Sequence, residues 1–352
     1  MKMKKLAAML LAGACALSVV GCGGGDKAAE KPADNKKQEQ SLKGKELVMY
    51  VSFHEDTAKE LSALFEKQTG CKVKFIRLPT GEAVARLVAE KASPKADVWL
   101  GGTVDAHEKM KAEGITTPYK SKVDSKLPDA YRDKDGFWKG TYIETLSIGV
   151  NEARFEKEFK SKGVAMPTQL ADLLNPAFKG EIIMPDPAKS GTGSTFLSSV
   201  LQSMGDEKGW EFVKSLKGQV AQFTPSGFTP AQKAGAGEFL ITVNFLSDQT
   251  KVSNSGQKLN RSVYKDAGWT LCGVSKLKGA AHDAEANAFI DFMMSKEAGD
   301  IMVKTTYGIA CNPESKVPEG LKKLSELPLF KAYDFAKAGK TKDADVAKFK
   351  GL

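Results

Sequence analysis

The sequence has few of the residues that build metal clusters, nucleophilic active sites or membrane spans. Its 352 residues include 3 histidines, and His54, His107 and His282 stand in no HExxH-type spacing. It contains no G-x-S-x-G motif, and its 5 cysteines form no C-x-x-C pair. No internal stretch reaches the roughly 18 apolar residues that a membrane-spanning helix needs. These absences argue against a zinc enzyme, an α/β-hydrolase and an internal membrane span, and we expect no cofactor.

Basic charge is in excess but is not concentrated. The formal net charge is +9, and Lys2, Lys4 and Lys5 at the very start contribute to it. Nucleic-acid-binding proteins cluster basic residues and interleave them with aromatics, a pattern that is missing here. We therefore expect no nucleic-acid partner. A mild positive field instead favours a small anionic solute or an anionic membrane surface.

The first 22 residues have the order of an export signal. Three lysines precede an apolar stretch at 6–20, and Val19-Val20-Gly21-Cys22 resembles a bacterial lipobox. We expect 1–21 to be a lipoprotein signal peptide, Cys22 to be lipidated, and 22–44 to be a polar tether. The protein would then be anchored outside the cytoplasmic membrane, at the cell surface or in the periplasm. An ordinary cleaved signal peptide is the alternative.

Three cysteines remain once the leader and Cys22 are set aside. Cys71, Cys272 and Cys311 have no metal-binding spacing. The sequence leaves open whether Cys272 and Cys311 pair or stay as free thiols.

Strands and helices alternate along the first part of the mature chain. Hydrophobic patterning predicts strands at 47–52, 72–76 and 96–100, with helices at 56–69, 80–91 and 105–113 between and after them. This order predicts an α/β fold with a parallel sheet. Two long extended runs, at 141–150 and 268–275, are suited to crossing between two lobes. We therefore expect a hinged pair of lobes with a ligand cleft between them.

The two crossovers divide the mature chain into expected parts. They are the first part of lobe 1 at 45–141, lobe 2 at 142–267, the second part of lobe 1 at 268–318, and C-terminal helices on lobe 2 at 319–352.

Four segments resemble those of a known family. They are F-E-K-Q-T-G-C-K-V at 65–73, A-D-V-W-L-G-G at 96–102, D-P at 186–187 with S-G-T-G-S-T at 190–195, and L-K-G-A at 277–280 with A-E-A-N-A-F-I-D-F-M-M-S-K-E-A at 284–298. They are similar to segments of the extracellular solute-binding proteins of ABC importers, in the group that takes ferric iron, phosphonates and sugar phosphates. The resemblance implies a type II periplasmic-binding-protein fold and a monomer without catalysis. It also implies a permease and an ATPase as partners.

The best candidate ligand site is the start of a predicted helix. Glycines let the backbone approach a ligand, and the first N–H groups of a helix attract anions. Hydroxyl side chains add hydrogen-bond donors without adding charge. The residues of this segment are Ser190, Gly191, Thr192, Gly193, Ser194 and Thr195. A plain helix cap is the alternative.

Further candidates lie where other strands end and helices begin. Ser52 and His54 follow the first strand, and Gly102 and Thr103 follow the third. The remaining candidates are Tyr142, Glu144, Phe228, Asn244 and Asp248. Capping of a helix or stabilisation of the hinge is the alternative role for these side chains.

The sequence of the segment 243–248 bears on the identity of the ligand. Ferric-iron receptors of the family commonly carry a tyrosine pair here, whereas this chain has V-N-F-L-S-D. Sugar-phosphate receptors tend to carry His-Asp, of which only Asp248 matches. A phosphonate or another small phosphorylated compound remains the preferred ligand. The alternatives are a ferric-iron receptor with a synergistic anion, an exported phosphatase, and an adhesin or signalling protein that kept the fold.

Overall fold

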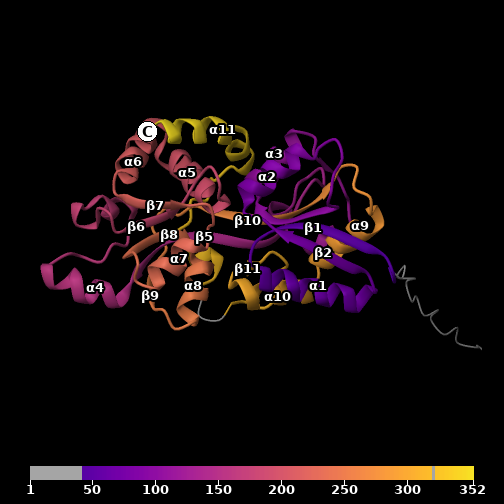
Figure 1. The fold of residues 1–352 in the computed structure, drawn as a ribbon, viewed down its shortest axis with the longest axis horizontal. Helices are drawn as coiled ribbons and strands as arrows, with labels where there is room; N and C mark the ends of the chain where they lie inside the picture. Colours follow the sequence, from indigo (N-terminus) through magenta and orange to yellow (C-terminus); the bar gives the residue numbers. More distant parts are fainter. Residues whose placement is uncertain (1–41, 319–321) are drawn as a thin grey trace, which may run out of the picture. The chain divides into compact units, whose positions relative to one another are not determined.

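The strands of the chain join side by side into one mixed sheet (Figure 1). The computed structural model describes residues 42–318 and 322–352. Along the sheet the order is β2-β1-β3-β10-β5-β8-β6-β7, while β4 pairs with β10 and both β9 and β11 pair with β5. The strands are β1 (Glu46–Ser52), β2 (Lys72–Arg77), β3 (Val98–Thr103), β4 (Thr116–Thr117), β5 (Lys139–Asn151), β6 (Ile182–Pro185), β7 (Val220–Thr224), β8 (Ile241–Phe245), β9 (Leu259–Ser262), β10 (Trp269–Leu277) and β11 (Ile309–Ala310).

The predicted parallel pairing holds at the two ends of the sheet and fails at its centre. β1 is parallel to β2 and β3, and β6 is parallel to β7 and β8. The long strands β5 and β10 are antiparallel to each other and to their outer neighbours β8 and β3. Strands that return through the middle of the sheet have to reverse direction, because they carry the chain between its two ends.

Strand β5 passes from one part of the molecule to the other. Its first half pairs with β10 and β11, and its second half pairs with β8 and β9. Beside it, the Leu146 N–H donates to the Gly268 carbonyl at 2.8 Å, so the residue preceding β10 lies next to the same crossing. All residues of β5 are buried. The two extended runs in the sequence therefore run together.

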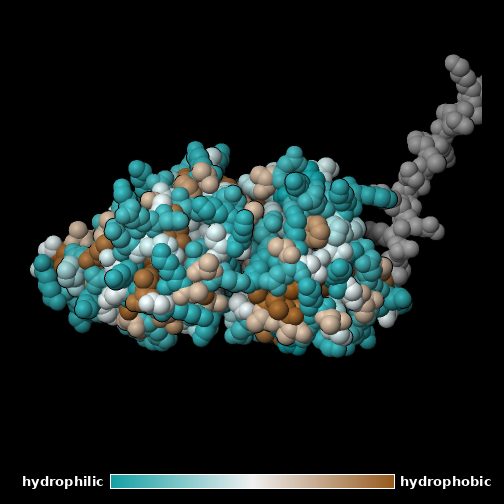
Figure 2. Space-filling view, turned by 90° about the horizontal axis from the view of Figure 1, so that it is seen from above, coloured by the Kyte–Doolittle hydropathy of each residue, from teal (hydrophilic) through white to brown (hydrophobic). Residues whose placement is uncertain are grey.

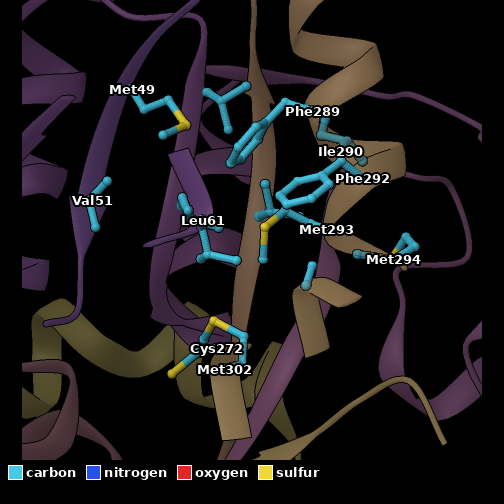
Figure 3. Packing of buried hydrophobic residues seen from close by; sticks show 14 of the residues in the cluster. Met49, Val51, Leu61, Cys272, Phe289, Ile290, Phe292, Met293, Met294 and Met302 are labelled. Carbon is cyan, nitrogen blue, oxygen red and sulfur yellow. The ribbon is translucent and has the colours of Figure 1, made fainter. Parts of the chain in front are cut away.

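The buried apolar side chains separate into two main cores. One cluster draws on residues 42–143 and 271–311, and we call this part the first lobe. The other draws on residues 146–267, which we call the second lobe, and on Phe349 near the C-terminus. In the first core, helix residues such as Leu61 and Phe289 pack against strand residues such as Met49 (Figure 3).

Helices flank the sheet in both lobes (Figure 1). Those of the first lobe are α1 (Glu55–Thr69), α2 (Thr80–Ala89), α3 (Val104–Ala112), α9 (Asp283–Met293) and α10 (Lys296–Thr306). Those of the second lobe are α4 (Glu152–Glu158), α5 (Gly191–Met204), α6 (Asp206–Lys217), α7 (Thr229–Gly235) and α8 (Leu246–Asn254). α1 ends where its sequence predicts, because Gly70 takes the left-handed conformation (φ 75°) as its C-cap.

The last helix, α11 (Phe335–Gly351), contacts both lobes. The sequence places it on the second lobe, and Phe349 does enter the second core. α11 also packs along α3 of the first lobe, where Lys342 pairs with Asp105 at 2.9 Å. A sequence pattern gives the amphipathic face of such a helix but not the acidic partner that its lysine meets.

Several sequence-based predictions concern the chain's exterior and its cysteines. In the parts of the chain that the structure describes, no helix is both long and apolar enough for a membrane crossing. The predicted signal peptide and Cys22 lie outside the described residues. Cys71, Cys272 and Cys311 are buried free thiols. Figure 2 shows a largely hydrophilic face with small, scattered hydrophobic patches.

Candidate ligand-binding cleft

A cavity of about 70 Å³ lies between the two lobes and is lined from both of them. Most of the candidate residues from the sequence meet there. They are Ser52, His54, Gly102, Thr103, Tyr142, Glu144, Ser190, Gly191, Thr192, Phe228 and Asp248.

The first turn of α5 presents free backbone donors to this cavity. Asp186 follows β6, and its side chain accepts from the Ala188 N–H at 2.8 Å, which turns the chain into the helix. Ser190 is the N-cap and its side chain makes no capping bond. In the described parts of the chain, the N–H groups of Gly191 and Thr192 have no acceptor. They are therefore available to an anion.

Two hydroxyl groups of the first lobe lie against this helix start. A Cβ added to Gly191 would sit 2.8 Å from Thr103 Oγ1 and 3.0 Å from Thr80 Oγ1. Glycine is thus needed for the two lobes to approach here. Thr103 is 2% exposed, and its hydroxyl oxygen has no hydrogen-bond partner among the described residues. A buried polar atom without a partner is costly, which points to a ligand in the cavity.

The end of β1 contributes another donor. Ser52 Oγ accepts a hydrogen bond from Trp99 Nε1 at 3.0 Å, so its own O–H proton remains free to donate. Gly102 in β3 has φ 76°, and a Cβ there would lie 2.6 Å from the Trp99 ring. The glycine lets Trp99 reach Ser52 from beneath the cavity.

A polar contact crosses the cleft between the lobes. His54 Nε2 lies 3.1 Å from Asp248 Oδ1, and the His54 ring packs edge-on against Phe228 with centroids 4.6 Å apart. His54 belongs to the first lobe, whereas Asp248 and Phe228 belong to the second. The pair closes one side of the cavity.

Two carboxyl groups lie together in the cavity wall. Glu144 is 4% exposed and accepts from Ser247 Oγ at 2.5 Å, and Asp248 is 7% exposed. Burial raises the pKa of Glu144 well above its usual value, and the charge of Asp248 raises it further. The surroundings of Glu144 therefore disfavour its charged form, although the hydrogen bond from Ser247 opposes the shift.

The single tyrosine that lines the cavity is a neutral phenol. Burial raises the pKa of Tyr142 well above its usual value, and the neighbouring Cys272 thiol and Glu144 add to the shift. Cys272 lines the same wall, and burial raises its pKa in the same way. Both groups offer polarity without charge.

The sequence analysis did not identify Arg77, the last residue of β2. Arg77 lines the cavity, its Nε donates to the Phe53 carbonyl at 3.3 Å, and it forms no ion pair with any described residue. Arg77 was not predicted because the candidate residues were sought mainly at helix starts, and Arg77 precedes a loop. The sequence did contain an indication of its position. Parallel strands end at the same edge of a sheet, and Ser52 at the end of β1 was already predicted to lie at that edge.

Other lining residues were also missed. Thr80 begins α2, and the segment 225–227 lies on the first turn of α5, where a Cβ on Gly227 would be 2.2 Å from Thr192 Oγ1. Of this loop, only Phe228 was predicted from the sequence, because long-range contacts between a loop and a helix leave no local pattern.

Four candidate residues lie away from the cavity. Gly193 packs against the backbone of 185–187, and Thr195 is fully buried within the second lobe. Ser194 donates to Asp105 of α3 at 3.0 Å, which joins the lobes rather than a ligand. Asn244 donates to the Gly227 carbonyl at 3.1 Å and so supports the cavity loop. A helix exposes only one side to a cleft. A run of small residues does not show which side that is, because the rotation of the helix about its axis leaves no pattern in it.

Comparisons with known proteins agree with this geometry. A family model for bacterial extracellular solute-binding proteins matches residues 93–341. An uncharacterised protein of Haemophilus influenzae is 33% identical over 84% of this chain and 86% of its own length. Iron uptake protein A1 of Synechocystis is 26% identical, over 74% of each chain.

A solved structure is similar along nearly the whole chain. It is the periplasmic binding protein AfuA from Actinobacillus pleuropneumoniae with exogenous fructose-6-phosphate bound. The TM-score is 0.83 and the sequence identity is 31%, with 88% of this chain and 98% of AfuA covered. The predicted two-lobed type II periplasmic-binding fold is thereby confirmed.

The cavity has the components of a binding site, namely donors, carboxyl groups and contacts between hinged lobes. The matched family consists of extracellular solute-binding proteins, and such proteins work with a membrane permease and its ATPase. The chain belongs to the bacterial extracellular solute-binding proteins, of the type that serves ABC importers.

Proposed function

We propose that this protein captures a small phosphonate or phosphorylated compound and hands it to an ABC importer, while a lipid on Cys22 holds it at the membrane. The observation that carries the proposal is the set of unpaired donors around one cavity. These are the Gly191 and Thr192 N–H groups, the Thr103 hydroxyl and the Arg77 guanidinium. Such donors suit a tetrahedral oxyanion.

The likeness to AfuA supports this ligand class, because that protein was solved with a sugar phosphate. The alternative of ferric iron has support from the relative named an iron uptake protein. Hard ferric ions favour phenolate and carboxylate ligands, yet burial raises the pKa of both Tyr142 and Glu144 and so disfavours these charged forms. Among the described residues no group of three or more metal-ligating side chains stands together. The donor set therefore favours the anion.

Capture would proceed by closure of the lobes. Contacts such as Ser194–Asp105 and the Gly81 N–H to the Lys189 carbonyl at 2.9 Å already join the lobes in this structure. A ligand that touches α5 and the first-lobe hydroxyls at once binds the closed form better than the open form. That difference in affinity drives the closure.

Isothermal titration with inorganic phosphate, alkylphosphonates and phosphate esters tests the ligand class. Arg77→Gln should weaken the best of these ligands about tenfold, since a charge-assisted hydrogen bond is lost at a partly solvated site. Arg132→Gln is the matched control, because Arg132 pairs with Asp129 and does not line the cavity. Binding of ferric iron, but of no phosphorus oxyanion, would contradict the proposal.

The lipid anchor has its own test. Cys22→Ser should move the protein from the membrane fraction to the soluble fraction of fractionated cells and leave its ligand affinity unchanged. An unchanged membrane fraction would remove the anchor from the proposal and leave the ligand class standing.

A further inference from the structure

The wall formed by Glu144 and Asp248 lacks a cation. In the described parts of the chain, neither carboxyl group lies within 4 Å of a lysine or arginine nitrogen. Asp248 contacts His54 and Asn244, and Glu144 contacts the Ser247 hydroxyl. Buried carboxylates are otherwise expected to be paired.

The other buried carboxylates differ in their partners. Asp97 contacts His282, Glu285 has no lysine or arginine nitrogen within 4 Å among the described residues, and two more pair with a lysine. Asp105 is 1% exposed and contacts Lys342 at 2.9 Å. Asp133 is 8% exposed and contacts Lys111 at 2.6 Å. The carboxyl groups that line the cavity lack this kind of partner, and the space beside them is the cavity itself.

Elsewhere in the same cavity, hydrogen-bond donors lack acceptors. Thr103 Oγ1 is buried without a partner, and the first N–H groups of α5 are free. One ligand therefore meets an excess of hydrogen-bond donors at one place and an excess of acceptors at another. An ammonium group fits the acceptors because it has three N–H donors and supplies the missing charge, whereas a hydroxyl has one donor and supplies none.

The donors and the acceptors line the same cavity of about 70 Å³. A ligand that meets both sets must therefore carry its oxyanion and its ammonium group on one molecule and close together.

We infer that the ligand is a small zwitterion, an aminoalkyl phosphonate or aminoalkyl phosphate, whose ammonium group lies between Glu144 and Asp248 while its oxyanion lies at the start of α5. This inference rests on the proposed function, since it names the substrate class of the same cavity. Glu144 and Asp248 are the residues that select for the amine.

Three probes that share a two-carbon chain and differ at its end separate the possibilities. Calorimetry on the mature chain would compare aminoethylphosphonate, hydroxyethylphosphonate and ethylphosphonate. We expect aminoethylphosphonate to bind at least 30-fold more tightly than ethylphosphonate. Glu144→Gln and Asp248→Asn should each reduce that preference to a few fold. A parent-like circular dichroism spectrum and a cooperative melting transition show that the variants fold.

The outcomes distinguish this inference from the proposed function. If ethylphosphonate binds and the amine adds nothing, the zwitterion is wrong and the oxyanion site stands. A tighter hydroxyethylphosphonate complex also overturns the zwitterion. If no probe binds, and neither inorganic phosphate nor a phosphate ester binds, both proposals fall.

A second readout follows the proton on Glu144. Burial and Asp248 raise the pKa of Glu144, and an ammonium group beside it would lower that pKa. The parent should therefore release more protons on binding than Glu144→Gln with the same ligand. Titration in buffers of different ionisation enthalpy measures this difference, and proton changes on the ligand cancel. The titratable and charged groups that share the cavities lined by Glu144 are His54, Arg77, Tyr142, Asp248, Cys272, Tyr307 and Lys322. Equal proton release by the two proteins would contradict the inference.

Discussion

The two lobes bring different chemistry to one cavity. The first lobe supplies side chains at strand ends, among them the Ser52 and Thr103 hydroxyls, the His54 ring and the Arg77 guanidinium. The second lobe supplies backbone donors at the start of α5 and a carboxylate, Asp248. Neither lobe alone surrounds a ligand. Under the proposed function, ligand binding and closure of the lobes would therefore be one event.

The lobes also differ in how they respond to acid. All 3 histidines of the chain, His54, His107 and His282, belong to the first lobe. His107 is fully buried, stacks on Trp99 with centroids 4.0 Å apart, and bonds the Gly101 carbonyl at 2.8 Å. Burial lowers its pKa from 6.5 to about 4. The second lobe has no group of this kind, so mild acid should loosen the first lobe first.

The largest expected effect is therefore on the stability of the first lobe. Between pH 6.5 and about 4, His107 binds a proton in the unfolded chain but not in the folded chain. The free energy of unfolding is therefore highest above pH 6.5 and falls as the pH drops toward 4. The loss from this residue should reach about 3 kcal/mol. Denaturant unfolding across this pH range measures it. His107→Gln should flatten the slope relative to the parent protein; equal slopes in the two proteins would contradict the prediction.

The next effect concerns the contact between the lobes. Gly191→Ala places a Cβ 2.8 Å from Thr103 Oγ1, so the lobes cannot close fully. Ligand affinity should fall about 10- to 100-fold, in line with an overpacking cost of about 1–3 kcal/mol. The melting temperature of the ligand-free protein should hardly change. The control is Gly218→Ala at the end of α6, where the nearest atom is 3.3 Å away. Unchanged affinity in the Gly191 variant would show that closure tolerates the methyl group.

The smallest effect separates ligand contact from lobe contact within α5. Ser194→Ala removes the hydrogen bond to Asp105 and should weaken every ligand about three- to tenfold, as expected for about 1 kcal/mol. Selectivity among ligands should not change, because Ser194 does not line the cavity. A titration series against several oxyanions checks this. A change in ligand preference would place Ser194 in the binding site after all.

Local patterns predicted much of the fold. The alternation of strands and helices near the N-terminus and the two long extended runs indicated the two lobes, because burial and periodicity are encoded in neighbouring residues. The antiparallel pairing of β5 with β10 was not predicted, since strand direction depends on how distant segments meet. The contact of α11 with α3 was missed for the same reason.

The site was predicted where it follows a local rule. Ser190, Gly191 and Thr192 begin a helix after a strand, and such starts are visible in sequence. Arg77 was missed because its role depends on the edge that β2 shares with β1. The orientation of Ser194 toward Asp105 depends on the rotation of α5 within the closed molecule, which one segment cannot specify.

The last helix has a consequence for motion. α11 lies against α3 and α5 at once, and its Lys342 neutralises Asp105 in the same place where Ser194 reaches across. Burial raises the pKa of Asp105, but Lys342 and the Ser194 hydroxyl outweigh it and hold the pKa below its usual value. When the lobes swing apart, the lysine can stay with this aspartate and keep its charge compensated. The C-terminal helix would then act as a third connection beside the two crossing strands. It would limit how far the lobes open when a bound molecule is released.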